Sequence, residues 1–136
     1  MVENGALKKI LTVLAVEDDA FMGSLIGENL HSAGYEVISV ESGTDGLSHA
    51  INNHPDLILL DVMLPDMSGL EVLKMLKENP LTKEIPIIIF SNLGGKEEIQ
   101  NGLALGACEY LIKSLTLPSE VTEIIAKRIS ANAVAP

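Results

Sequence analysis

Leu57-Ile-Leu-Leu-Asp61 is a run of four apolar residues that ends on an aspartate. A strand that is apolar on both faces fits the centre of a parallel sheet, where helices cover both sides. Two further runs, Ile10–Val16 and Ile87–Phe90, are apolar almost throughout. Val37–Val40 and Tyr110–Ile112 have the length of strands but look more peripheral. We therefore expect five strands, three of them central.

Segments with helical spacing separate these predicted strands. Their apolar residues recur every three or four positions, which places them on one face of a helix. The apolar stripes fall within residues 21–33, 47–51, 70–76, 99–103 and 121–129. Alternation of strand and helix implies right-handed crossovers and a parallel sheet. The sequence predicts an α/β fold of the doubly wound class, with a five-stranded parallel sheet and helices on both faces.

The length of 136 residues suits one domain. We place this domain at residues 9–130, after an N-terminal extension at residues 1–8 and before a loose tail at residues 131–136.

The formal net charge of -10 disfavours direct binding to nucleic acid. It also disfavours anionic membrane surfaces, and no apolar run approaches the ~20 residues of a membrane span. A metal cation or a basic protein surface is a better partner for this chain. The single cysteine, Cys108, cannot form an internal disulfide. We expect a cytoplasmic protein without membrane insertion.

Polar side chains follow four of the predicted strands. In open parallel sheets, ligands bind beyond the carboxyl ends of the strands. The residues that follow the strands are Glu17-Asp18-Asp19, Asp61, Ser91-Asn92 and Lys113-Ser114. Carboxylates, a hydroxyl and an ammonium should therefore meet at one edge.

Each of these residues alone has an ordinary explanation. Aspartate often caps a helix or starts a turn, so Asp61 could do no more than that. Asp18 or Asp19 could cap the helix that follows them, and Lys113 could be a solvated lysine.

Glu17, Asp18 and Asp61 together indicate a metal, because three adjacent carboxylates repel one another unless a cation neutralises them. Oxygen ligands favour Mg²⁺, which keeps several waters that a phosphate group can displace. A carboxylate can attack phosphorus, while Lys113 and Ser91 could hold the phosphoryl oxygens.

These motifs resemble the receiver domain of two-component response regulators. The resemblance covers about Ile10–Ile129 and rests on the spacing of its motifs. The motifs are Glu17-Asp18, the segment Leu59–Gly69, Ser91, Tyr110 and Lys113. The resemblance implies a flavodoxin-like sheet with strand order 2-1-3-4-5 and a protein that catalyses only its own phosphorylation and dephosphorylation.

The resemblance also implies roles for individual residues. Asp61 would accept a phosphoryl group from a histidine kinase or a histidine phosphotransfer protein. Asp18, Asp61 and the backbone carbonyl of Met63 would bind Mg²⁺, with Glu17 acting through a bound water. Ser91 and Lys113 would contact the phosphoryl group.

A switch is implied as well. Ser91 and Tyr110 would move on phosphorylation and remodel the surface of the fourth helix, fifth strand and fifth helix. Downstream effectors would bind this surface, and a homodimer through it is a further option. Ordinary packing in the strand is the alternative role for Tyr110.

Several positions concern the timing and geometry of the site. Ser114 replaces the usual proline, so we predict a trans peptide bond before it, because a cis bond would cost roughly 3 kcal/mol. Asn92 replaces a usually small residue, and it could crowd the site or add a donor. Gly69 matches a turn where glycine accepts conformations that other residues resist. Met63 and Leu93 are apolar, and we hypothesise that they lengthen the life of the acyl phosphate.

Three other classes of protein fit this sequence less well. An aspartate-nucleophile phosphohydrolase needs a second aspartate two residues after its nucleophile, and Glu17-Asp18-Asp19 fits that poorly. A binding module that is never phosphorylated would not need the acidic pair, Asp61, Ser91 and Lys113. A nucleotide-binding flavodoxin-like protein needs a glycine-rich loop after the first strand, and this chain has none.

Overall fold

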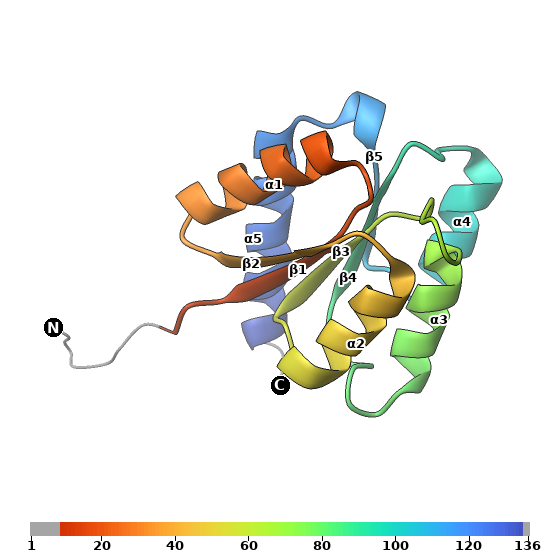
Figure 1. The fold of residues 1–136 in the computed structure, drawn as a ribbon, viewed down its shortest axis with the longest axis horizontal. Coiled ribbons are helices and arrows are strands. Elements are labelled where there is room, and N and C mark those ends of the chain that lie inside the picture. Colours follow the sequence, from red (N-terminus) through yellow and green to blue (C-terminus); the bar gives the residue numbers. More distant parts are fainter. Residues whose placement is uncertain (1–8, 135–136) are drawn as a thin grey trace, which may run out of the picture.

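Five parallel strands form one sheet in the order β2-β1-β3-β4-β5, with helices on both faces (Figure 1). The computed structural model describes residues 9–134. The strands are β1 (Thr12–Val16), β2 (Glu36–Val40), β3 (Leu57–Leu60), β4 (Ile87–Ser91) and β5 (Glu109–Ile112). The predicted fold class and strand order are confirmed.

Helices α1 and α5 cover one face of the sheet, and α2, α3 and α4 cover the other (Figure 1). The helices are α1 (Ala20–Ser32), α2 (Gly43–Asn53), α3 (Gly69–Glu78), α4 (Lys96–Ala104) and α5 (Pro118–Val134). A short 3₁₀ helix, η1 (Lys113–Leu115), connects β5 to α5. Gly34 and Gly106 follow α1 and α4 with positive φ angles, the backbone conformation that ends many helices.

The central strand β3 contributes to a hydrophobic core on each side. Leu57 and Leu59 pack into the core under α1 and α5. Ile58 and Leu60 pack into the core under α2 and α3. Successive strand residues point to opposite faces, so this strand has to be apolar at every position. That requirement explains why its sequence shows no alternation of polar and apolar residues.

The ends of the domain differ in part from the prediction. Helix α5 continues to Val134, so residues 131–134 of the tail predicted at residues 131–136 are helical. That this tail is loosely held stays a prediction. The last turn of α5 is Ala131-Asn-Ala-Val134, and alanine favours the helix beyond the last core contact at Ile129. The extension predicted at residues 1–8 lies outside the described residues, as do the last two residues of the chain.

Leu73 tests the core assignment because it is fully buried in α3. We expect Leu73→Ala to lower the free energy of unfolding by about 2–5 kcal/mol, through lost contacts and the cavity left behind. Met75 lies on the same helix with 49% of its surface exposed, which makes Met75→Ala a matched control. The control should change the free energy of unfolding by no more than about 0.5 kcal/mol. Urea titration measures both, and equal losses would contradict the assignment.

Candidate functional site

The predicted site residues lie together at the carboxyl edge of the sheet. Glu17 follows β1, Asp61 follows β3, Ser91 ends β4 and Lys113 follows β5. The strands are parallel and in register, with Leu60 beside both Val16 and Ile89, so their carboxyl ends reach this edge together. Strand order alone therefore brings residues 96 positions apart in the chain, Glu17 and Lys113, into contact.

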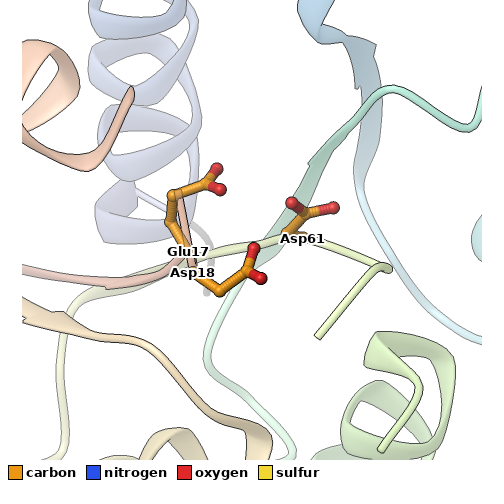
Figure 2. Close-up of side chains that lie close together, drawn as sticks. All are labelled: Glu17, Asp18 and Asp61. Atoms are coloured by element: carbon orange, nitrogen blue, oxygen red, sulfur yellow. The ribbon is translucent and has the colours of Figure 1, made fainter. Parts of the chain in front are cut away.

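Three carboxylates form the centre of this edge. Glu17, Asp18 and Asp61 each offer one oxygen, and these oxygens all lie within 4.8 Å of one another (Figure 2). Asp61 is the most buried of the three, with 4% of its surface exposed, whereas Asp18 is exposed. The predicted acidic cluster exists in the fold and opens to solvent at Asp18.

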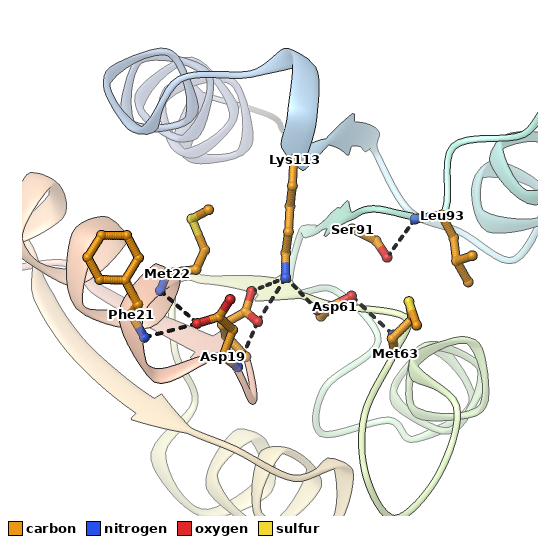
Figure 3. A network of polar contacts seen from close by, with 9 residues as sticks. Asp19, Phe21, Met22, Asp61, Met63, Ser91, Leu93 and Lys113 are labelled. Carbon is orange, nitrogen blue, oxygen red and sulfur yellow. Dashed lines mark hydrogen bonds and ion pairs between the residues drawn. The ribbon is translucent and has the colours of Figure 1, made fainter.

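Lys113 forms ion pairs with two of the three carboxylates (Figure 3). Its Nζ lies 2.7 Å from Oδ2 of Asp61 and 2.6 Å from Oε1 of Glu17. All three side chains are at least nine-tenths buried, so these contacts are poorly screened by water. The alternative of a solvated lysine is thereby excluded.

Burial raises the pKa of the Glu17 carboxyl, and hydrogen bonds from Lys113 and the Asp19 amide only partly oppose it. Burial would also lower the pKa of the Lys113 ammonium, but its hydrogen bonds to Asp61 and Glu17 outweigh burial and raise it. Lys113 therefore remains charged. Three carboxylates against one ammonium leave two formal negative charges, which a divalent cation would neutralise. The donor set is all oxygen and fits Mg²⁺.

Asp19 has a role that differs from that of its neighbours. Its Oδ1 accepts hydrogen bonds from the amides of Phe21 and Met22, at 3.0 and 3.2 Å, and it is the N-cap of α1. The question of which aspartate caps this helix is therefore settled in favour of Asp19. Asp18 does not cap the helix, and its carboxylate belongs to the acidic cluster.

Ser91 is fully buried, and its Oγ accepts a hydrogen bond of 3.3 Å from the amide of Leu93. Two residues beyond Leu93, Gly95 is the N-cap of α4 and offers no side chain for a capping hydrogen bond. The hydroxyl of Tyr110 donates a hydrogen bond to the carbonyl of Leu93. The predicted hydroxyl and the predicted switch tyrosine are thus joined through one loop residue.

The loop after Asp61 is held against the end of β3. The amide of Met63 donates a hydrogen bond of 3.0 Å to Oδ1 of Asp61. The amide of Gly69 donates to the carbonyl of Val62 at 2.8 Å, which closes the loop.

Glycine is required at position 69 for a reason other than the predicted one. Gly34 and Gly106 are the glycines with positive φ in residues 9–134, so the φ of Gly69 demands no glycine. Instead, a β-carbon on Gly69 would lie 2.1 Å from the carbonyl oxygen of Asp61. The expectation that Gly69 is needed for its conformation is therefore wrong, and close backbone approach is the cause.

The structure also places the other positions that concern the timing and geometry of the site. The bond between Lys113 and Ser114 is trans, as predicted, and residues 9–134 contain no cis peptide bond. Asn92 is exposed beside the buried Ser91. Met63 and Leu93 are also exposed, with 54% and 37% of their surfaces accessible, and they lie near Asp61 and Ser91 (Figure 3).

Asp66 is a residue of this loop that sequence reasoning missed. Its carboxylate accepts hydrogen bonds from the amides of Gly43 and Thr44 and from the Thr44 hydroxyl. These bonds lower the pKa of the Asp66 carboxyl to about 2, so it is ionised at neutral pH. The sequence does contain an aspartate after Pro65, but its partners are 22 and 23 residues away in the chain.

Comparison with known proteins identifies the family. The chain matches the model of the response regulator receiver domain over residues 13–126. It belongs to that family. The chain is therefore a receiver domain of two-component signal transduction, and the acidic edge described above is consistent with phosphoacceptor function.

Relatives of this receiver domain include both short and long proteins. The polar-differentiation response regulator DivK of Brucella ovis is 38% identical over 117 residues, which cover 83% of this chain and 92% of DivK. The phosphate regulon transcriptional regulatory protein PhoB of Pseudomonas aeruginosa is 37% identical over 116 residues, which cover 85% of this chain and 49% of PhoB. A CheY-like receiver domain from Methanospirillum hungatei superimposes with a TM-score of 0.86 at 26% identity, covering 92% of this chain and 98% of that one.

The receiver domain has no helix within residues 9–134 that combines the length and apolarity needed to cross a bilayer.

Gly69→Ala tests the close contact behind the acceptor. The new β-carbon would collide with backbone, so the loop must move, and we expect a loss of about 1–3 kcal/mol or more in the free energy of unfolding. Gly27 in α1 is the matched control, because a β-carbon there meets nothing within 4 Å. Gly27→Ala should stabilise the protein by about 0.5–1 kcal/mol, since alanine favours the helix. A Gly69→Ala variant as stable as wild type would contradict this account.

Proposed function

We propose that Asp61 is the phosphoryl acceptor of this receiver domain and that Mg²⁺ is required for its phosphorylation. The observation that carries the proposal is the buried Asp61 carboxylate, held by Lys113 at 2.7 Å within a cluster of oxygen ligands. Of the three clustered carboxylates, Asp61 is the most buried and is fixed on both oxygens, by Lys113 and by the Met63 amide. A nucleophile so fixed loses little freedom on reacting.

The donor is a phosphohistidine on a histidine kinase or a histidine phosphotransfer protein. A carboxylate oxygen of Asp61 attacks phosphorus, the new oxygen–phosphorus bond forms, and the phosphorus–nitrogen bond breaks. The electron pair of that bond leaves with the imidazole. Lys113 and Ser91 then bind the oxygens of the transferred group, because one is an ammonium and the other a hydroxyl at the same edge.

The carboxylates of Asp18 and Asp61 and the backbone carbonyl of Met63 are the proposed Mg²⁺ ligands, and Glu17 is proposed to act through a bound water. Bound Mg²⁺ supplies neutralising charge for these carboxylates and for the phosphoryl oxygens. Glu17 and Asp61 share Lys113, so a charged partner remains near both when the cation is present.

The proposed switch consists of Ser91, Tyr110, α4 and the loop that connects β4 to α4. Phosphorylation adds about 1.5–2 negative charges at Asp61, which draws the Ser91 hydroxyl toward the new oxygens. The Ser91 hydroxyl now binds the Leu93 amide, and the Leu93 carbonyl binds Tyr110, so movement at Ser91 reaches the tyrosine. Gly102 is the buried residue of α4, which leaves this helix lightly anchored and suited to move.

Effector proteins or domains are the proposed readers of the α4-β5-α5 surface, and a homodimer through it is a second option. The relative PhoB, of which this chain matches about half, is a transcriptional regulatory protein. We place the protein in the cytoplasm, where kinases supply phosphoryl groups. We also propose that it has no catalytic activity beyond its own phosphorylation and dephosphorylation.

The direct test is phosphorylation by a small acyl phosphate, followed by intact mass spectrometry. Wild type should gain the mass of one phosphoryl group when Mg²⁺ is present and no mass when a chelator removes it. Asp61→Asn should gain nothing, because an amide is a poor nucleophile, whereas Asp45→Asn, at an exposed aspartate of α2, should react like wild type. A gain of mass in Asp61→Asn would contradict the assignment.

Met63 and Leu93 provide a second test, of the lifetime of the phosphoryl group. We expect Met63→Asn together with Leu93→Gln to shorten the half-life of the acyl phosphate, because polar side chains there can position an attacking water. Decay of the phosphorylated mass after removal of the donor measures this half-life. Leu103→Asn is the control, since Leu103 is also exposed but lies on α4. Equal half-lives in all variants would contradict the hypothesis.

A further inference from the structure

Asp66 joins the loop after the acceptor to the start of a helix that is distant in sequence. Its Oδ1 accepts a hydrogen bond of 2.8 Å from the Gly43 amide. Its Oδ2 accepts bonds of 2.9 Å from the Thr44 amide and 2.7 Å from the Thr44 hydroxyl. A carboxylate at this end of a helix is also favoured by the helix dipole.

These bonds complete the capping of α2. The first amides of a helix have no partner within the helix itself. In α2, Asp66 takes the amides of Gly43 and Thr44, and the N-cap Ser42 takes the amide of Asp45 at 3.1 Å. The next amide, that of Gly46, bonds to the Ser42 carbonyl. Two side chains thus share one helix start, and one of them belongs to the acceptor loop.

The same turn also receives an apolar side chain of the loop. A β-carbon on Gly43 would lie 2.5 Å from Cγ and 2.9 Å from Sδ of Met67. The absence of a side chain at Gly43 therefore lets Met67 lie against the start of α2. Polar and apolar contacts fix the loop tip, Asp66-Met67, to one point.

The base of the loop is the part that meets the acceptor. Met63 pairs with Ser68 across an isolated antiparallel bridge, and the Gly69 amide bonds to the Val62 carbonyl. The loop between these bonds is short, so a tip anchored by Asp66 restricts the backbone of Met63. The Met63 amide donates a hydrogen bond to Oδ1 of Asp61.

We infer that Asp66 is a positioning residue, which fixes the Met63 backbone for metal binding by tying the acceptor loop to α2. This inference rests on the proposed function, in which the Met63 carbonyl binds Mg²⁺. Asp66 itself does not touch the metal or the reacting atoms. A role confined to capping α2 is the alternative.

Comparing Asp66→Ala with Ser42→Ala separates the two roles, because each removes a cap from α2 and only the first releases the loop. Both variants should lower the urea midpoint. Asp66→Ala should weaken Mg²⁺ binding, measured by calorimetry, by roughly tenfold. This is the lower end of the loss in metal affinity that follows when a residue supporting a metal ligand is removed. Ser42→Ala should bind Mg²⁺ like wild type. Asp66→Asn, which keeps one acceptor oxygen, should recover part of the affinity.

Amide hydrogen exchange of the metal-free protein gives an independent readout. Asp66→Ala should speed exchange at Met63 and Gly69, and Ser42→Ala should leave these two amides as protected as in wild type. Equal effects of both variants on Mg²⁺ affinity and on the two amides would overturn the positioning role. A wild type that binds no Mg²⁺ would instead overturn the proposed metal site, and the exchange rates would still decide whether Asp66 holds the loop.

Discussion

The ion pairs of Lys113 with Asp61 and Glu17 are the interaction on which the rest of the site depends. Taking charges out of water is costly, and a buried pair is tolerated only when its geometry is good. Here one ammonium lies within 2.8 Å of oxygens from both carboxylates. The three residues come from the ends of three different strands, so their distances are set by the sheet and not by flexible loops. Because the ammonium balances one charge of three, two formal negative charges are left for the proposed cation to neutralise.

The buried central strands and the segments that follow them have different roles in this domain. The strands β1, β3 and β4 are buried on both faces and give the edge its rigidity. The proposed moving parts and metal ligands lie beside Asp61, with Ser91 at the end of β4 and Leu93 in the next loop on one side, and Met63 on the other. The loop that contains Leu93 contacts Tyr110 and continues into the lightly anchored α4. The loop that contains Met63 is instead fixed to α2 by Asp66. This asymmetry fits a site in which one loop moves and the other holds the metal.

Much of this architecture is readable from the sequence because it rests on local patterns. The apolar runs of β1, β3 and β4 predict the central strands, and the less uniform runs predict β2 and β5 at the edges. Residues directly after strands predict the site, since parallel strands end at one edge. The features that escaped prediction depend on tertiary structure. Asp66 caps a helix more than twenty residues earlier, and Gly69 is needed because the backbone of Asp61 and Val62, just after β3, passes next to it.

Locating the phosphoryl group within the chain shows directly whether Asp61 is the acceptor. Borohydride reduction of the phosphorylated protein converts an aspartyl phosphate into homoserine, and peptide sequencing by mass spectrometry then finds its position. If Asp61 is the acceptor, homoserine should replace Asp61, with Asp18, Asp19 and Asp66 unchanged. Homoserine at any of those three positions, or a stable phosphate on Ser91, would contradict this assignment.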